Sequence, residues 1–277
     1  MANFSMPPTG FGPGSQPLAE DDELQYTVMP QDMRTYAPHT PEFDDAARVA
    51  AGTALMHRVA ADCSASAKDL QSSDHDLTGL DADNRAFLKD VLGEGEVSVR
   101  LRGIPAIRAQ ESFFAGVWLL NGAGVDQLEI APIPALALER AHQPHRPALL
   151  TAAPKPGDIA NAPALLAELI DKSRSYQVGQ MAHVINLTLL PHTEGDLTWL
   201  DAAVGEGSVT ILSRGYGNCR VTATALAHVW RVQFYNSMDT LILDTFEVTQ
   251  MPEVALAADE DLNDSAARIL DVLETIK

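Results

Sequence analysis

The chain has 277 residues, 46% of them hydrophobic, and carries a formal net charge of −19. That length allows one large domain or two ordinary ones, and the charge argues against nucleic acid and anionic membranes as partners. The two cysteines have no Cys-x-x-Cys spacing, and no apolar run approaches the roughly 18 residues of a membrane helix, which argues against a disulfide framework, a zinc ribbon and membrane insertion.

Residues 1–43 are rich in proline, glycine and acidic side chains and show no hydrophobic periodicity, so we expect a disordered acidic tail. Residues 1–45 hold eight acidic side chains against one basic side chain, and residues 253–277 hold seven against two. This excess either keeps the two ends solvated or forms an acidic surface that receives a basic peptide. The N-terminus lacks a basic stretch followed by an apolar one, so we expect no signal peptide and a cytoplasmic protein.

The first half of the remaining chain shows helical periodicity followed by strand-like alternation. A helix is predicted at 44–61, where apolar residues recur at helical spacing behind an acidic start. A second helix, 83–92, has Gly93 just beyond its end, where glycine allows the left-handed turn that closes a helix. The predicted strands are 97–101, 104–109, 113–120 and 128–133.

The second half repeats this order after a segment, 143–161, whose four prolines predict a linker. The predicted helices are 163–173, 195–204 and, at the end of the chain, 263–276. The predicted strands are 209–213, 219–225, 229–236 and 240–248. Several of them alternate apolar and polar residues, as expected for antiparallel sheets with one buried face.

The two halves contain the same segment at a constant offset of 112 residues. The matching strings are Phe87-Leu88 with Trp199-Leu200, Gly93-Glu94-Gly95 with Gly205-Glu206-Gly207, and Val117-Trp118 with Val229-Trp230. A fixed offset over this distance predicts a duplicated unit. We therefore expect an α+β protein of two tandem related lobes, 44–142 and 162–277, each with helices followed by a mainly antiparallel sheet. Ligands or partners are expected where the lobes meet or differ.

The glycine and histidine patterns do not predict a cofactor site. Phosphate-binding glycines lie between a strand and a following helix, whereas both Gly-Glu-Gly strings follow a helix and precede a strand, so they are interpreted as turns. None of the eight histidines belongs to an HxxxH helix, which favours surface or core histidines. A metal site that bridges two chains stays open as an alternative.

The densest polar cluster in the chain, 213–220, surrounds one of the cysteines, Cys219. The equivalent segment of the first lobe, 101–108, is less polar, which indicates either a special role for the second lobe or simply a buried cysteine after a turn. A catalytic cysteine needs a nearby base, and His228 is about a strand away, so no enzyme is predicted. Two cysteines also cannot supply four thiolates to an iron–sulfur cluster within one chain.

At these residues the sequence resembles a known family, the HupH/HyaF family of nickel–iron hydrogenase expression and formation proteins. The similarity runs nearly end to end and is strongest over 184–250. The strings that carry it are Met29-Pro30, Met33-Arg34-Thr35-Tyr36, Val184-Ile185-Asn186-Leu187-Thr188-Leu189-Leu190-Pro191, Leu212-Ser213-Arg214-Gly215-Tyr216-Gly217-Asn218-Cys219-Arg220, Val229-Trp230-Arg231-Val232-Gln233-Phe234, Asn236-Ser237-Met238-Asp239-Thr240 and Phe246-Glu247-Val248.

The resemblance implies a cytoplasmic accessory protein for an uptake hydrogenase, without a catalytic residue, metal or cofactor that can be assigned. Its implied partners are the iron–sulfur small-subunit precursor, before export by the twin-arginine route, and other maturation factors. We expect a chaperone; a metal or cluster carrier that acts as a dimer, or a cysteine-dependent enzyme, are the alternatives. The candidate partner contacts are Arg214, Tyr216, Asn218, Cys219, Arg220, Asn236 and Asp239.

Overall fold

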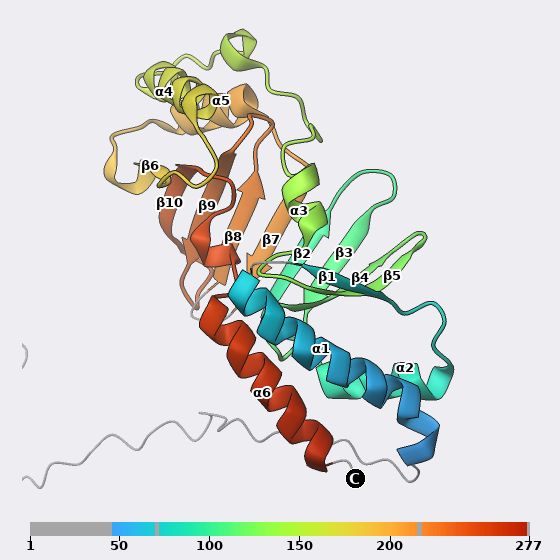
Figure 1. Ribbon diagram of the computed structural model, residues 1–277. Helices are drawn as coiled ribbons and strands as arrows, with labels where there is room; N and C mark the ends of the chain where they lie inside the picture. Colours follow the sequence, from blue (N-terminus) through green and yellow to red (C-terminus); the bar gives the residue numbers. More distant parts are fainter. Residues whose placement is uncertain (1–45, 70–71, 215–217, 276–277) are drawn as a thin grey trace, which may run out of the picture. The chain divides into compact units, whose positions relative to one another are not determined.

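The computed structural model describes residues 46–69, 72–214 and 218–275, so the predicted acidic tail lies outside the described residues. In this part of the chain, ten strands form one continuous sheet in the order β1-β5-β4-β3-β2-β7-β8-β9-β10-β6 (Figure 1). Every neighbouring pair of these strands is antiparallel. The mixed helix and antiparallel-sheet class is therefore confirmed.

The first repeat supplies one half of the sheet. Its elements are η1 (Ala46–Val49), α1 (Ala50–Asp69), β1 (Ser73–Asp76), α2 (Ala82–Leu92), β2 (Val97–Leu101), β3 (Ile107–Glu111), β4 (Val117–Gly122), β5 (Val125–Ile130) and α3 (Ala135–Arg140). The carboxylate of Asp81 accepts the backbone N–H of Asn84 at 2.8 Å and so caps the start of α2. Gly93, at a φ of 55°, ends that helix with a backbone N–H donated to Lys89.

The second repeat supplies the other half. Its elements are η2 (Leu150–Ala152), α4 (Ala162–Ser175), β6 (His183–Asn186), η3 (Leu187–Leu189), α5 (Glu194–Val204), β7 (Val209–Ser213), β8 (Asn218–Ala223), β9 (Val229–Tyr235), β10 (Leu241–Val248), η4 (Glu253–Ala255) and α6 (Asp259–Thr275). Thr193 and Asp196 form a reciprocal capping box at the start of α5. Gly205, at a φ of 67°, ends α5 as Gly93 ends α2.

The two halves join where β2 pairs with β7, and equivalent residues of the repeat lie opposite each other there. Val99 is paired with Ile211, its own counterpart 112 residues later. On either side, Arg102 donates its backbone N–H to Ser208, and Arg214 donates its backbone N–H to Glu96. These two bonds are also equivalent under the repeat. A local two-fold axis therefore passes through the Val99–Ile211 pair, as in a symmetric dimer fused into one chain.

The same side-chain contacts recur in both halves. Nε1 of Trp118 donates to the carbonyl oxygen of Ala131 at 2.9 Å, and Nε1 of Trp230 donates to that of Thr249 at 3.2 Å. Both indoles are fully buried, so these bonds satisfy donors that would otherwise be costly to bury. One difference is His228, which holds a φ of 62° where the first repeat has Gly116 at 77°.

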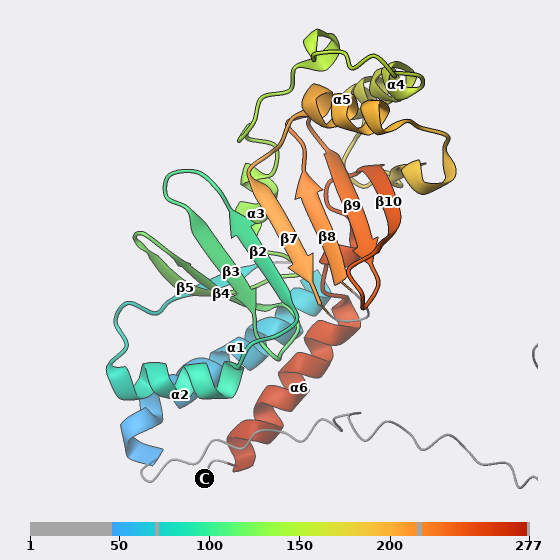
Figure 2. The same ribbon diagram turned by 180° about the vertical axis from the view of Figure 1, so that it is seen from behind.

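Helices cover the two ends of one sheet face and leave its centre open. At one end, residues of α1, α2 and α6 form a core with Val117, Leu128 and Ile130 of the sheet. At the other end, α4 and α5 pack on residues of β6, β9 and β10. Between them, strands β3, β2, β7 and β8 are uncovered on this face (Figure 2). The opposite face of these strands holds the central core, to which α3 and η4 contribute (Figure 1).

The last helix belongs to the second repeat in sequence but completes the core of the first. Buried residues of α6, including Leu262 and Ile269, lie in the same cluster as Met56 of α1 and Phe87 of α2. In the second repeat, α4 is the equivalent of α1. It packs against α5 and has no contact of the kind that α1 makes with α6 in the part of the chain that the structure describes. The two lobes therefore share both a sheet and a helical layer.

The predicted elements fit the structure best around the repeated strings. Helices 83–92 and 195–204 and strands 97–101 and 209–213 are confirmed. The first helix was predicted to end at 61 but continues to Asp69. The predictions missed β1, β6 and α3, which are too short to show a detectable periodicity.

The later strands of the first lobe were placed wrongly. β3 begins at Ile107 rather than at Ile104, whose side chain is fully exposed in the preceding turn. β5 covers Val125–Ile130 rather than 128–133, because a turn at Gly124, with a φ of 76°, connects it directly to β4. None of the helices in the described ranges is both long and apolar enough to cross a membrane.

The segment predicted as a linker is held against the second lobe. Arg146 forms an isolated antiparallel bridge with Glu206. Further along, the carbonyl oxygen of Ala153 accepts Nε1 of Trp199 at 3.0 Å, and Ala153 is buried in the core beneath α4 and α5.

Candidate functional site

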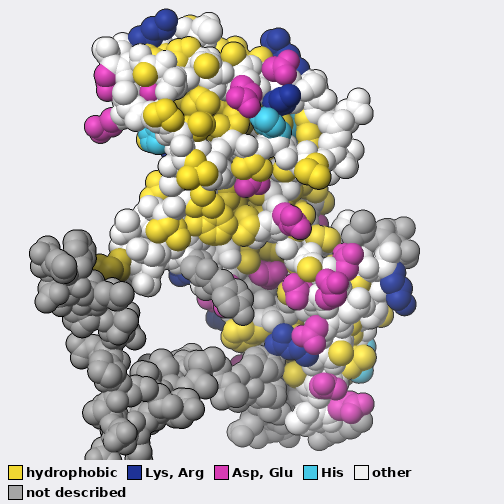
Figure 3. All heavy atoms as spheres, turned by 90° about the vertical axis from the view of Figure 1, so that its left-hand side faces the viewer, with side chains coloured by type: hydrophobic (Ala, Val, Ile, Leu, Met, Phe, Trp, Pro, Cys, Tyr) yellow, Lys and Arg dark blue, Asp and Glu magenta, His cyan; other side chains and the backbone are white. Residues whose placement is uncertain are grey.

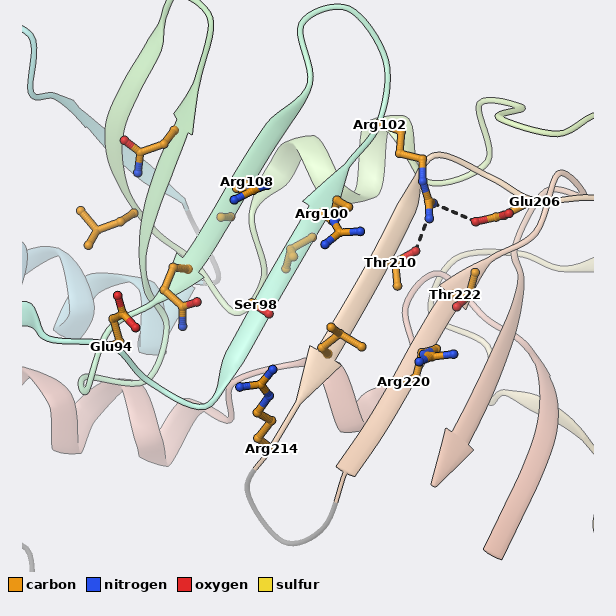
Figure 4. Close-up of a pocket in the computed structure, with 16 residues that line it drawn as sticks. Glu94, Ser98, Arg100, Arg102, Arg108, Glu206, Thr210, Arg214, Arg220 and Thr222 are labelled. Atoms are coloured by element: carbon orange, nitrogen blue, oxygen red, sulfur yellow. Dashed lines mark hydrogen bonds and ion pairs between the residues drawn. The ribbon is translucent and has the colours of Figure 1, made fainter. Parts of the chain in front are cut away.

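A hollow of about 640 Å³ lies on the open sheet face, over the junction of β2 with β7 (Figure 4). Side chains from β2, β3, β4, β7 and β8 line it. Five of the chain's 19 basic residues are among them, namely Arg100, Arg102, Arg108, Arg214 and Arg220. We call this feature the arginine hollow. It lies where the two lobes meet, one of the places at which the sequence predicted a ligand or partner.

Strand alternation explains why these arginines share one face. Along β2, Val99 and Leu101 are buried in the central core, so Ser98 and Arg100 must point to the other side of the sheet. β3 has the same pattern, with Ile107 and Ala109 buried and Arg108 exposed between them. The corresponding strands of the second lobe, β7 and β8, repeat it. The hydrophobic pattern that builds the core thus also builds the hollow.

Much of the lining follows the two-fold relation between the lobes. Five equivalent pairs of polar residues line the hollow, namely Glu94 with Glu206, Ser98 with Thr210, Arg102 with Arg214, Arg108 with Arg220, and Gln110 with Thr222. Among the equivalent pairs in the lining, the charge differs between Arg100 and its counterpart Leu212. The hollow therefore carries more positive charge on the side of the first lobe.

One of the arginines is neutralised within the hollow. The guanidinium of Arg102 lies 2.9 Å from the carboxylate of Glu206 and donates to the hydroxyl of Thr210 at 3.1 Å (Figure 4). No carboxylate among the described residues forms an ion pair with Arg100, Arg108, Arg214 or Arg220. Arg220 instead lies over the ring of Tyr235, 5.7 Å from its centroid. All four are exposed, so their charges are available to a partner.

The structure brings five of the predicted contact residues together beside the arginine hollow. A second hollow of about 490 Å³ is lined by Arg214, Asn218, Cys219, Arg220 and Asp239, and both arginines also line the first hollow. Nδ2 of Asn218 donates to the carboxylate of Asp239 at 3.1 Å. Tyr216 lies outside the described residues.

Asn236 and Cys219 have structural contacts of their own. The side-chain oxygen of Asn236 accepts the backbone N–H groups of Met238 and Thr240, both at 2.9 Å, and so organises the β9–β10 turn. Cys219 also lines the second hollow but is only 5% exposed and packs in the central core. Burial raises the pKa of its thiol to about 11, so the reactive thiolate form is scarce at neutral pH.

The structure separates Cys219 from the base considered for it. Cys219 pairs with Phe234 near the start of β8, whereas His228 follows the other end of that strand, where Ala223 pairs with Trp230. Four residues of strand, about 14 Å at roughly 3.4 Å per residue, separate the two positions along β8. Such a distance does not allow direct proton transfer.

The histidines do not form a metal cluster in the part of the chain that the structure describes, where no group of three or more histidine, cysteine or acidic residues converges. The closest approach is His142 with His228, whose ring centroids are 6.0 Å apart. Burial lowers the pKa of His142 to about 4, and its Nδ1 bonds to the carbonyl oxygen of Thr224 at 3.0 Å. The ring of His142 also packs edge-on against the indole of Trp230, at a centroid distance of 5.1 Å.

The sheet also has an apolar edge. On the side where β6 ends the sheet, hydrophobic side chains gather at the surface (Figure 3). Exposed hydrophobic residues of β6, η3 and β10 include Val184, Leu189 and Ile242, which are 51%, 80% and 56% exposed. An exposed edge of this kind is able to pair with another chain.

Sequence reasoning did not select Arg100, Arg102 or Arg108. The available signal was the alternation of arginine with buried residues in β2 and β3, which places positive charge on a single face. It becomes informative only when the pairing of β2 with β7 is known, because that pairing brings the two faces together.

A duplicated α+β fold with an open, arginine-lined sheet face defines the structural class of this protein. The family model "HupH hydrogenase expression protein, C-terminal conserved region" matches residues 49–144 and 159–276. The chain belongs to the HupH hydrogenase expression protein family.

Three named relatives illustrate the range of the family. The "Hydrogenase expression/formation protein HupH" of Rhodobacter capsulatus is 58% identical over the full length of both chains. The "Hydrogenase expression/formation protein HoxQ" of Cupriavidus necator is 43% identical over 100% of this chain and 99% of its own. The "Hydrogenase-1 operon protein HyaF" of Escherichia coli is 35% identical over 72% of each chain. A solved HupH structure from Thiobacillus denitrificans is 28% identical, covers 41% of this chain and 95% of its own, and has a TM-score of 0.38.

Proposed function

We propose that this protein is a non-enzymatic accessory factor for maturation of a nickel–iron uptake hydrogenase. The observation that carries the proposal is the 58% identity, over both full lengths, to a protein named for hydrogenase expression and formation. In the finer form of the proposal, the protein is a chaperone. It binds the iron–sulfur small-subunit precursor before export, shields it while clusters are inserted or protected, and then releases it.

The geometry of the site supports a binding role. The arginine hollow is open, polar and built by both lobes, as suits reversible contact with a protein surface. Burial raises the pKa of Cys63 to about 12 and that of Cys219 to about 11, which disfavours thiolate chemistry at either residue. The residues proposed to contact the partner are Arg214, Asn218, Arg220 and Asp239 around the hollows.

The test is co-elution of the full chain with the small-subunit precursor on anaerobic size exclusion, with metal analysis of every peak. We expect the two proteins to elute together as a complex that contains no metal and that forms by binding alone. Absence of a complex, with iron or another metal on the free protein, would overturn the chaperone and favour the carrier. A chain with Cys219→Ser should bind as the original does; loss of maturation with binding intact would favour an enzyme.

A further inference from the structure

We propose that the arginine hollow binds an acidic peptide segment of the partner protein, whose carboxylates are held between Arg100 and Arg108. The inference rests on the proposed function, because it takes the hydrogenase precursor as the protein that supplies the segment. It assigns the ligand chemistry of the hollow from its own charges and geometry.

The first argument is the position of Arg100 and Arg108. They are direct cross-strand partners in the β2–β3 ladder and stand on the same face of the sheet. Side chains so placed have Cβ atoms about 5 Å apart, and like charges directly opposite each other destabilise a sheet. No carboxylate among the described residues pairs with either guanidinium. A ligand carboxylate between the two would relieve the repulsion and accept charge-assisted hydrogen bonds.

The second argument is the difference between the lobes. The cross-strand pair equivalent to Arg100 and Arg108 in the second lobe is Leu212 and Arg220. The fold therefore accommodates leucine at the position of Arg100, and packing does not require a charge there. A second arginine at this place is explained by a ligand that needs two guanidinium groups.

The third argument concerns the kind of anion. The floor of the hollow includes the apolar side chains of Leu119 and Leu212 beside the polar ones of Ser98 and Thr210. Two carboxylates, Glu94 and Glu206, also lie in the lining, so negative groups of a ligand are favoured beside the arginines and not along its whole length. A short segment that alternates acidic and apolar side chains matches this lining, and a volume of about 640 Å³ accommodates a few residues.

The probe is a blocked hexapeptide of alternating aspartate and leucine, titrated calorimetrically into the full chain at 50 mM salt. The matched peptide has asparagine in place of aspartate. We expect the acidic peptide to bind at least tenfold more tightly than the asparagine peptide, and to weaken at least tenfold at 500 mM salt because its contacts are ionic. Equal affinities, or no binding of the acidic peptide, would overturn the proposal.

Variants of the two arginines locate the binding. The double variant Arg100→Gln with Arg108→Gln should lower the affinity for the acidic peptide at least tenfold. The single variant Arg100→Leu, which copies the residue of the second lobe, should also lower this affinity. The matched control is Arg174→Gln, an exposed arginine of α4 outside the hollow, which should leave the affinity unchanged. Unaltered binding by the double variant would overturn the site. Circular dichroism should show that all three variants fold.

Two further arms separate the ligand class and the proposed function. Inorganic phosphate or an octamer of deoxythymidine is then added at one tenth of the concentration of the acidic peptide. If either one displaces the peptide, the ligand is a phosphate compound and the peptide proposal is overturned. In co-elution, the double variant should lose the small-subunit precursor while Arg174→Gln keeps it; retention by the double variant would overturn this use of the hollow. If the original chain binds the acidic peptide but no precursor, the proposed function fails while the ligand chemistry of the hollow stands.

Discussion

At the scale of single residues, Glu111 couples stability to pH. Its side chain is 8% exposed at the end of β3, and one carboxylate oxygen accepts the backbone N–H of Gly116 at 3.0 Å. Burial raises its pKa to about 7, and the nearby carboxylates of Asp261 and Glu96 add to the rise. The folded state therefore keeps a proton that the unfolded chain releases near the ordinary glutamate pKa of 4.5. This residue makes folding less favourable as pH rises from about 4.5 to 7, with no further loss above that range.

We expect Glu111→Gln to remove this loss, because the neutral amide still accepts the Gly116 N–H. The stability gained over the original chain should be small at pH 4.5 and reach about 3 kcal/mol at pH 8, since each unit of pKa corresponds to about 1.4 kcal/mol. Thermal or urea unfolding at both pH values measures the difference. Glu274→Gln, at an exposed position of α6, is the matched control. A gain that does not change with pH would contradict the ionisation argument.

At the scale of elements, α6 ties the two lobes into one folding unit. Ile269 is fully buried in the core that also contains Met56 and Phe87 of the first repeat. Ile269→Ala should lower the free energy of unfolding by about 2–5 kcal/mol, because it leaves a cavity in that core. Leu270→Ala, next to it but 44% exposed, should change stability much less.

The shape of the unfolding curve tests the connection. Because β2 pairs with β7 and α6 packs in the first lobe, we expect one urea transition for the original chain and for Ile269→Ala, detected by the buried indoles of Trp118 and Trp199. A second transition, in which one lobe melts while the other stays folded, would show that the shared sheet and helix do not couple them.

Elements marked by local chemistry were predictable from the sequence, and elements set by distant contacts were not. Gly93 and Gly205 end their helices through backbone geometry, so the boundaries of α2 and α5 follow from the sequence alone. The four-residue edge strand β1 exists because it pairs with β5, more than 50 residues later, and its alternation is too short to detect.

The same distinction holds for the candidate site. The cluster around Arg214 and Arg220 stood out because it differs between the repeats, and both residues do line the hollow. Arg100 and Arg108 carry no unusual local pattern. Their importance arises from register, which places them directly opposite each other and beside the second lobe. Register between strands of a duplicated chain depends on tertiary contacts that composition and spacing do not contain.

At the scale of the whole molecule, charge is divided between two kinds of region. The chain has a net charge of −19, and its first 45 residues hold eight acidic side chains against one basic side chain. The arginine hollow, in contrast, concentrates positive charge on one face. Under the proposed function, a precursor with a basic twin-arginine leader and an acidic segment would meet both. The acidic end would attract the leader over a distance, and the hollow would hold the acidic segment after contact.

These two contacts should separate kinetically. Exposed charges that act at a distance mainly change the association rate, whereas groups in close contact mainly change the dissociation rate. Replacing Glu20, Asp21, Asp22 and Glu23 by their amides should slow association of the precursor about threefold to tenfold at 50 mM salt, and this effect should vanish at 500 mM salt. Arg100→Gln with Arg108→Gln should instead speed dissociation. Stopped-flow or surface-based kinetics measures both rates.

The leaderless precursor is the control that isolates the leader. It should associate equally fast with the original chain and with the amide variant, while still dissociating faster from the double arginine variant. If the amide variant slows association of the leaderless precursor as well, the acidic end steers the subunit body rather than the leader. If neither variant changes either rate, charge on the two regions plays no part in recognition, and the apolar edge of β6 and β10 becomes the surface to test. We therefore expect the acidic end to set the association rate of the precursor and the arginine hollow to set its dissociation rate.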